Sequence, residues 1–286
     1  MIETIYITRH GFRLNWVTTN WTSATGTARD PTLAAYGVSQ AEQLAKYFTS
    51  LPEAERPTAI FSSPFYRCLQ TATPVATALN LPLYVEHGIG EWYSPVEPGT
   101  GLHPRPGNAY SLKQYFPLID TSYSSTWLVS RHGESLDEVQ RRTDGFLEAF
   151  VPRVEGGSPP PLAHHSAAGV STHKKIIFVG HAASCITLIK SLAGSKVNGA
   201  DIRIGTCSVT KMEKESEGGV LGAFEVVGQP GDASFLTNGI ERDWGFRDIL
   251  VDEETGRVVN DHGVTGSENE VDETSHGGLQ LPNSKM

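Results

Sequence analysis

A short apolar stretch near the amino terminus ends abruptly in a group of cationic residues. Residues 4–8 are β-branched or aromatic, which predicts a buried strand. Arg9, His10 and Gly11 follow directly, and a further arginine stands at position 13. Gly11 allows a sharp turn and a close backbone approach. Open α/β sheets bind their ligands where strands end at the carboxyl edge of the sheet. This feature therefore favours an α/β sheet with functional side chains at that edge.

Strand and helix patterns alternate along most of the chain, which favours a mostly parallel central sheet with helices on both faces. The expected class is therefore α/β, a three-layer α/β/α sandwich. Two late strands are expected to be antiparallel and peripheral. The expected elements are strands at 4–8, 58–61, 81–85, 175–179, 206–211 and 220–226, and helices at 33–49, from Pro64 to 79 with Ser62 or Ser63 as the cap, 134–151 and 183–192.

Three segments depart from this pattern. Residues 94–130 are interrupted by prolines and glycines, and we expect an irregular, lid-like insertion over the site. Residues 152–174 form a low-complexity loop rich in Gly, Pro, Ser and Ala. Residues 251–286 hold eight acidic and two basic residues with few large apolar ones, which predicts a disordered tail. One domain is therefore expected over residues 1–250.

Composition narrows the class of function. The 286 residues are 38% hydrophobic and 19% charged, which is typical of a globular protein. No apolar run approaches the roughly 20 residues that span a bilayer, and the first residues lack a signal-peptide pattern. Three cysteines without metal-like or disulfide-like spacing favour a reducing, intracellular setting, cytoplasmic or nuclear. The net charge of −9 comes mainly from residues 251–286, and it is the lack of a basic stripe that disfavours direct nucleic-acid binding.

Chemistry-bearing residues follow several of the expected strands. The candidate set is Arg9, His10, Arg13, Asn15, Arg67, Glu91 and His181. Because the carboxyl ends of parallel strands meet at one edge, these side chains are expected to converge. Two histidines, several arginines and one carboxylate suit phosphoryl transfer: His10 attacks phosphorus, the arginines and His181 bind the phosphate oxygens, and Glu91 protonates the leaving oxygen. No metal or other cofactor is required by this set.

Several of these residues have alternative interpretations. His10, His181 and Glu91 could ligate a metal, but the neighbouring arginines would repel a cation. Arg13 could instead be a surface ion-pair partner. The Arg-His-Gly triplet recurs at 131–133, where it precedes a helix rather than ending a strand, so His132 is not expected to be catalytic. Trp92 and Tyr93 suit either a pocket wall or the core.

The motifs resemble those of the histidine phosphatase superfamily, in its phosphoglycerate-mutase-like branch. The resemblance covers about residues 2–215, and it implies a nucleophile at His10, a phosphate pocket that includes Arg9, Arg67 and His181, and an acid at Glu91. The motifs that carry it are Arg9-His10-Gly11, Leu33-x-x-x-Gly37-x-x-Gln40-Ala41, Ser62-Ser63-Pro64-x-x-Arg67-x-x-Gln70-Thr71, Glu91, Glu134-Ser135-Leu136 and Gly180-His181-Ala182.

The chain departs from the mutases after Gly11, where Phe12-Arg13-Leu14-Asn15-Trp16 is more similar to phosphatases. With the later segment 238–246, it looks closest to a fungal group that includes stand-alone phosphatases and the histidine-phosphatase-like subunit of the transcription factor TFIIIC. The expected function is metal-independent hydrolysis of a small phosphorylated substrate or a phosphopeptide. One alternative is a TFIIIC-related assembly subunit with a transcription-factor partner. If that role needs a further carboxy-terminal domain, we expect no room for one after Phe246. The other is a phosphoglycerate mutase.

Overall fold

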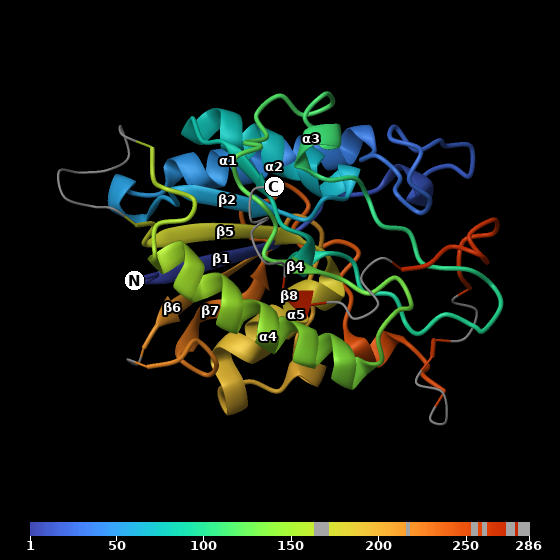
Figure 1. The fold of residues 1–286 in the computed structure, drawn as a ribbon. Helices are drawn as coiled ribbons and strands as arrows, with labels where there is room; N and C mark the ends of the chain where they lie inside the picture. The colour runs from blue at the N-terminus through green and yellow to red at the C-terminus, as the bar shows by residue number, and fades with distance from the viewer. Residues whose placement is uncertain (163–171, 216–217, 253–256, 259–261, 273–277, 280–286) are drawn as a thin grey trace.

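The computed structural model describes residues 1–286 except 163–171, 216–217, 253–256, 259–261, 273–277 and 280–286. Its centre is a six-stranded sheet in the order β3-β2-β5-β1-β6-β7 (Figure 1). The first four of these strands are parallel, and β6 and β7 are antiparallel additions at one edge. The strands are β1 Thr4–Arg9, β2 Ala59–Ser62, β3 Leu83–Val85, β4 Trp127–Leu128, β5 Lys175–Gly180, β6 Val209–Lys214, β7 Phe224–Asp232 and β8 Gly278–Leu279.

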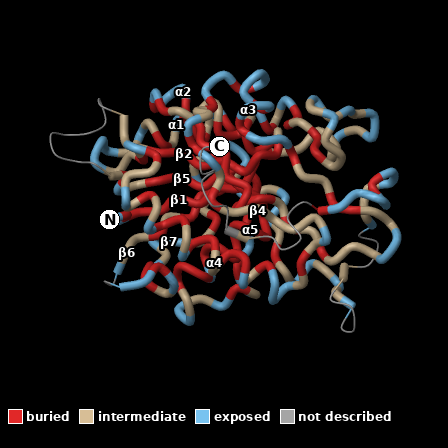
Figure 2. Tube along the Cα trace, viewed as in Figure 1, coloured by how far each residue is buried: buried red, intermediate tan, exposed pale blue. Residues whose placement is uncertain are grey.

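Helices cover both faces of the sheet, with α1 and α2 on one side and α4 and α5 on the other (Figure 1). Each face has its own buried apolar cluster, because residues of a strand alternate between the two faces. Figure 2 shows the buried residues concentrated in the sheet and its flanking helices. The predicted three-layer α/β/α class is confirmed. The helices are α1 Ala35–Ser50, α2 Tyr66–Leu79, α3 Ala109–Leu112, α4 Leu136–Glu155 and α5 Ala182–Ala193.

The four predicted helices each start one or two residues away from the prediction, and two of these differences have a visible cause. Helix α1 begins at Ala35, and Leu33 instead forms an isolated antiparallel bridge with Arg13. Helix α2 begins at Tyr66, with Phe65 rather than Ser62 or Ser63 at the capping position and no side-chain cap there. The Tyr66 amide instead donates to the carboxylate of Asp30, at 2.8 Å. Asp30, which is distant in the sequence, thus accepts from the free amide at the helix start, where the sequence predicts a serine cap.

A close backbone contact between α1 and the turn after β1 explains one glycine pair. A Cβ on Gly37 would lie 2.2 Å from the Phe12 carbonyl oxygen, and one on Gly11 would lie 2.8 Å from the Gly37 carbonyl oxygen. Neither distance is sterically possible, so both positions need glycine. The contact places the turn that carries His10 directly against α1.

The irregular segment 94–130 is held to the sheet by a buried carboxylate. Glu86, just after β3, accepts hydrogen bonds from the hydroxyls of Tyr123 and Ser125 and from the Thr126 amide, at 2.5–2.7 Å. Glu86 is fully buried. These charge-assisted bonds fix the end of the insertion beside the carboxyl edge of the sheet.

Described residues beyond position 250 pack onto the same insertion. Asp272 is buried, where it pairs with Arg105 at 3.1 Å and accepts from the Arg131 amide at 2.8 Å. Ser267 is also buried and accepts from the Leu102 amide. Asp272 and Ser267 are therefore packed against the protein, and the positive charge of Arg105 balances the negative charge of Asp272. The domain boundary near residue 250 and the disorder of the segment as a whole stay predictions.

The linker that was expected from residue 152 begins later, because α4 continues to Glu155 with Pro152 inside it. Within the described part of the chain, no helix combines the length and apolarity that crossing a membrane requires.

Candidate active site

His10 lies at the carboxyl end of β1, beside the equivalent position of β5. Arg9 pairs with Gly180 in the parallel register, so the next residues, His10 and His181, are neighbours. Their ring centroids are 5.5 Å apart. The Nδ1 atom of His10 lies 2.8 Å from the Gly11 carbonyl oxygen. A carbonyl only accepts, so Nδ1 carries the proton and Nε2 keeps a free lone pair. This tautomer is the one that an imidazole nucleophile needs.

The surroundings of His10 keep its ring neutral. Burial lowers its pKa well below 6.5, and the positive charges of Arg67 and Arg9 lower it further. Only 2% of the residue is exposed. At neutral pH the ring is therefore unprotonated at Nε2 and can attack an electrophile.

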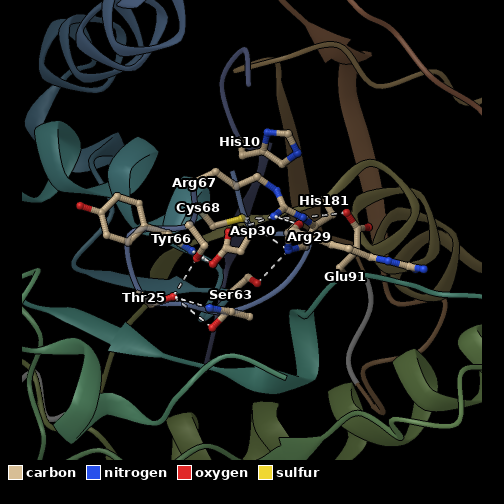
Figure 3. Close-up of polar contacts among 12 residues, drawn as sticks. His10, Thr25, Arg29, Asp30, Ser63, Tyr66, Arg67, Cys68, Glu91 and His181 are labelled. Atoms are coloured by element: carbon tan, nitrogen blue, oxygen red, sulfur yellow. Dashed lines mark hydrogen bonds and ion pairs between the residues drawn. The ribbon is translucent and has the colours of Figure 1, made fainter. Parts of the chain in front are cut away.

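Arg67, at the start of α2, lies at the centre of a buried polar network (Figure 3). Its guanidinium is 3.0 Å from Asp30 on one side and 3.0 Å from Glu91 on the other. The same guanidinium lies 3.1 Å from Nδ1 of His181. Arg67 is fully buried, yet the two carboxylates raise its pKa against the effect of burial. The network holds a permanent positive charge next to His10 without water around it.

Glu91 and His181 form a coupled pair within this network. Nδ1 of His181 lies 3.2 Å from the Glu91 carboxylate, and its Nε2 lies 2.8 Å from the Ser63 hydroxyl. Burial would raise the pKa of Glu91, but His181, Arg67 and Arg13 together hold it well below its usual range. Burial lowers the pKa of His181 to about 4 despite the neighbouring carboxylate. In the free site Glu91 is therefore ionised and His181 neutral at neutral pH.

Arg9 and Arg13 present further cationic groups to the same space. Nη1 of Arg9 donates to the backbone carbonyls of Ile204 and Arg242, at 2.8 and 2.5 Å. The guanidinium of Arg13 lies over the Trp16 ring, 4.3 Å from its centroid, in a cation–π contact rather than a surface ion pair. The buried Nε atoms of Arg9, Arg13 and Arg67 have no hydrogen-bond partner among the described residues. Buried donors without a protein partner in three neighbouring arginines suit an anion.

A cavity of about 250 Å³ opens beside His10. Of the predicted residues, Arg9, His10, Arg13 and Glu91 line it, whereas Arg67 and His181 lie behind Glu91. Asn15 is not among the described residues that line the cavity, although its buried Oδ1 has no hydrogen-bond partner within that part of the chain. Trp92 and Tyr93 both line it, so they belong to the pocket wall.

Sequence reasoning missed the roles of two polar residues. Asp30 is fully buried and contacts both Arg67 and the first turn of α2, but the loop before α1 carries no pattern that identifies it. The sequence predicts Ser63 as a possible helix cap, whereas in the structure its hydroxyl contacts His181.

The other histidines lie elsewhere. His132 is exposed, as expected for a residue outside the site. His164 and His165 fall outside the described residues. His173, in the segment predicted as a low-complexity loop, is buried with its Nδ1 2.9 Å from the Thr58 hydroxyl. No group of three or more His, Cys, Asp or Glu side chains in the described part of the chain could hold a metal ion.

Comparison with known proteins agrees with this geometry. The family model of the histidine phosphatase superfamily (branch 1) matches residues 5–226. The chain belongs to the histidine phosphatase superfamily. Among curated proteins, the transcription factor tau 55 kDa subunit of Saccharomyces cerevisiae is 35% identical over 272 residues, 86% of this chain and 59% of that protein. The chain thus spans less than two thirds of the length of this relative. The predicted relation to the fungal transcription-factor subunit is confirmed.

Solved structures of histidine phosphatase fold share the architecture. The ecdysone phosphate phosphatase of Bombyx mori, in complex with tungstate, superposes with a TM-score of 0.57 at 17% identity, covering 80% of this chain and 93% of that one. Mycobacterial hydrolase 1 gives a TM-score of 0.50 at 17% identity, with 80% and 99% covered. At these identities the likeness shows the fold alone.

Proposed function

We propose that the chain hydrolyses phosphomonoesters without a metal ion, through a phosphohistidine on His10. Nε2 of His10 forms a bond to phosphorus while the bond between phosphorus and the leaving oxygen breaks. Glu91 delivers a proton to that oxygen, which leaves as the alcohol. Water then attacks the phosphohistidine, and orthophosphate departs with His10 restored. The small phosphorylated substrate or phosphopeptide expected from the sequence enters through the cavity beside His10.

The arginines stabilise charge on the transferring group. Arg9 and Arg13 line the cavity, and Arg67 supplies a third charge through its contact with Glu91. Fixed donors in a buried site stabilise the transition state without reorganisation of solvent. His181 belongs to the same pocket, since it contacts both Arg67 and Glu91. Asn15 is a weaker candidate for a phosphate contact, since it does not line the cavity in the described part of the chain.

The proton on Glu91 has a natural source in the substrate. Glu91 is ionised in the free site because His181, Arg67 and Arg13 lower its pKa. A phosphomonoester has a second pKa of about 6, so its monoanion carries one proton into the pocket. The dianion that remains competes with Glu91 for Arg67, which raises the affinity of Glu91 for that proton.

One observation carries this proposal: a neutral His10 with Nδ1 held by a carbonyl, facing a cavity that it shares with Arg9, Arg13 and Glu91. The test is phosphate release from phenyl phosphate in the presence of EDTA, with His10→Ala as the control. Release by the unchanged chain alone supports the proposal. Equal release from His10→Ala contradicts the assigned nucleophile, and loss in EDTA contradicts metal independence.

A second candidate function rests on the 35% identity to a transcription factor subunit. In this alternative the chain assembles with a transcription-factor partner, in the nucleus, and the pocket is auxiliary. Stable co-purification with such a partner, together with no turnover of any phosphomonoester, favours this candidate over the hydrolase.

The mutase alternative predicts a different product. A phosphoglycerate mutase moves phosphate between hydroxyls of phosphoglycerate and releases little orthophosphate. Incubation with 3-phosphoglycerate and separate quantification of 2-phosphoglycerate and orthophosphate distinguishes the two reactions. The hydrolase proposal predicts orthophosphate.

A further inference from the structure

The residues that line the cavity beside His10 fall into two chemical groups. Arg9, His10, Arg13 and Glu91 carry charge or titrate, and we call them the floor. The apolar residues, which we call the wall, are Trp92, Ala182, Ala183, Trp244, Ile249 and Val258. Tyr93 and Ser94 also line the cavity and are polar.

The wall residues pack into one cluster rather than standing singly. Trp92 and Ala183 are buried, and Trp244, Ile249 and Val258 pack against them. Phe246 joins the two tryptophans, with ring centroids 5.7 Å from Trp92 and 5.2 Å from Trp244. The wall therefore presents a continuous apolar surface to the cavity.

The floor and the wall are positioned by the same backbone. Trp244 pairs with Ile204 through two hydrogen bonds, at 3.0 and 3.2 Å. Arg9 donates to the carbonyl of Ile204 and to that of Arg242, two residues before Trp244. The distance between phosphate donors and apolar wall is thus set by direct contacts.

We propose that this pocket selects phosphomonoesters of apolar alcohols, and that Trp244, Ile249 and Val258 determine this specificity. The proposal rests on the proposed hydrolase function. With the phosphate at the floor, the alcohol portion lies against the wall. An apolar group there leaves water for an apolar surface, whereas a sugar-like hydroxyl against the wall loses its hydration and finds no hydrogen-bond partner on the aliphatic wall side chains Ile249 and Val258.

The sharpest test compares two substrates with the same ring. Cyclohexyl phosphate and myo-inositol 1-phosphate share a six-membered carbocycle, and only the second carries further hydroxyls. The inositol oxygen is the better leaving group, so intrinsic reactivity opposes the expected preference. We expect kcat/KM to be at least tenfold higher for cyclohexyl phosphate, since differences of one methylene or one hydroxyl in apolar pockets give roughly 10- to 200-fold discrimination.

The matched variants place a hydroxyl on the wall or away from it. The double variant Ile249→Thr/Val258→Thr is expected to lose at least tenfold in kcat/KM for cyclohexyl phosphate and to change less than threefold for myo-inositol 1-phosphate. The control Ile240→Thr/Val271→Thr alters the same residue types at positions that are 59% and 81% exposed. It should leave both substrates unchanged. Thermal melting of each variant shows that the fold is retained.

Binding of cyclohexylphosphonate, measured by calorimetry against orthophosphate, separates this proposal from the proposed hydrolysis. The phosphonate cannot be hydrolysed, so tighter binding than orthophosphate that weakens only in the wall variant supports the specificity even if no substrate turns over. Turnover with equal or greater kcat/KM for the inositol ester overturns the specificity and leaves the hydrolase proposal intact. A wall variant that affects both substrates equally, or no preference in binding, also overturns it.

Discussion

The floor and the wall of the cavity are built in different ways. Each floor residue ends a strand or follows one closely: His10 comes directly after β1, and Glu91 stands six positions after Val85 at the end of β3. The wall residues Trp244, Ile249 and Val258 do not closely follow a strand of the main sheet. They are held by packing, and Trp244 also by the Ile204 backbone. The sheet thus determines the positions of the floor residues, whereas the carboxy-terminal segment supplies Trp244, Ile249 and Val258 of the wall. Variants of the floor should therefore affect every substrate, and variants of the wall should affect stability and selectivity.

The largest effect is expected from Arg67→Ala. The substitution removes a fixed charge beside His10 and leaves Asp30 without its partner. We expect kcat/KM to fall about 10²- to 10³-fold for all phosphomonoesters, as for other preorganised donors. Arg67→Lys serves as the control that keeps the charge but not the planar fork. A loss below threefold in a variant that melts normally would remove Arg67 from the phosphate pocket.

A stability effect is expected in the segment beyond residue 250 from Asp272→Asn. The change removes the charge from a buried hydrogen-bonding group, which should lower the free energy of unfolding by about 1–3 kcal/mol. The surface ion pair of Asp201 with Arg247 provides a contrast, since Asp201→Asn should cost about 1 kcal/mol or less. Urea unfolding measures both. If the two variants are equally stable, the segment beyond residue 250 does not pack as described, and the result would support the prediction of a disordered tail.

Asp30→Asn should have a smaller effect on the floor. Asparagine keeps an oxygen for the Tyr66 amide but removes the negative charge that orients Arg67. We expect a decrease of about tenfold in kcat/KM, near the value of one charged hydrogen bond. Because Asp30 lies outside the cavity lining, the same factor should apply to cyclohexyl phosphate and myo-inositol 1-phosphate. A factor that differs between the two would mean that the floor and the wall are not independent.

Below pH 6.5, kcat/KM should depend much less on pH than it would for a nucleophilic histidine with an ordinary pKa. An imidazole nucleophile with the usual pKa of 6.5 loses activity about tenfold per unit below that value, because protonation removes its lone pair. Burial together with Arg67 and Arg9 lowers the pKa of His10 well below 6.5. Protonation therefore begins only at lower pH, and kcat/KM should not decline between pH 6.5 and about 5. A decline that starts near 6.5, while circular dichroism shows an intact fold, would contradict the neutral buried His10.

The sequence predicted the floor far better than the wall, for physical reasons. Strands of four to six residues rich in β-branched, aromatic or aliphatic side chains are local signals, and a parallel sheet brings their ends together whatever the intervening loops contain. The sequence alone therefore assigns His10, Arg67 and His181 to one site. Asp30 could not, because its role depends on a long-range contact with the free amide of Tyr66.

The disordered carboxy-terminal tail stays a prediction, and charge composition does not show which acidic residues of that segment are buried. An excess of acidic residues indicates disorder only if the charges stay solvated. Asp272 is buried instead, between Arg105 and the Arg131 amide. Arg105 lies in the insertion and Arg131 directly follows it, and the insertion has no regular sequence pattern of its own. Local composition therefore gave no sign of the contact.

The most direct test of the account is to capture the phosphorylated nucleophile. Wild-type protein mixed rapidly with phenyl phosphate, quenched in alkali and analysed by intact and peptide mass spectrometry should carry one phosphoryl group on His10. His10→Ala should carry none under the same conditions. A phosphoryl group on another residue, or phosphate release by wild type without any phosphorylated His10 at any time after mixing, would contradict catalysis through this histidine.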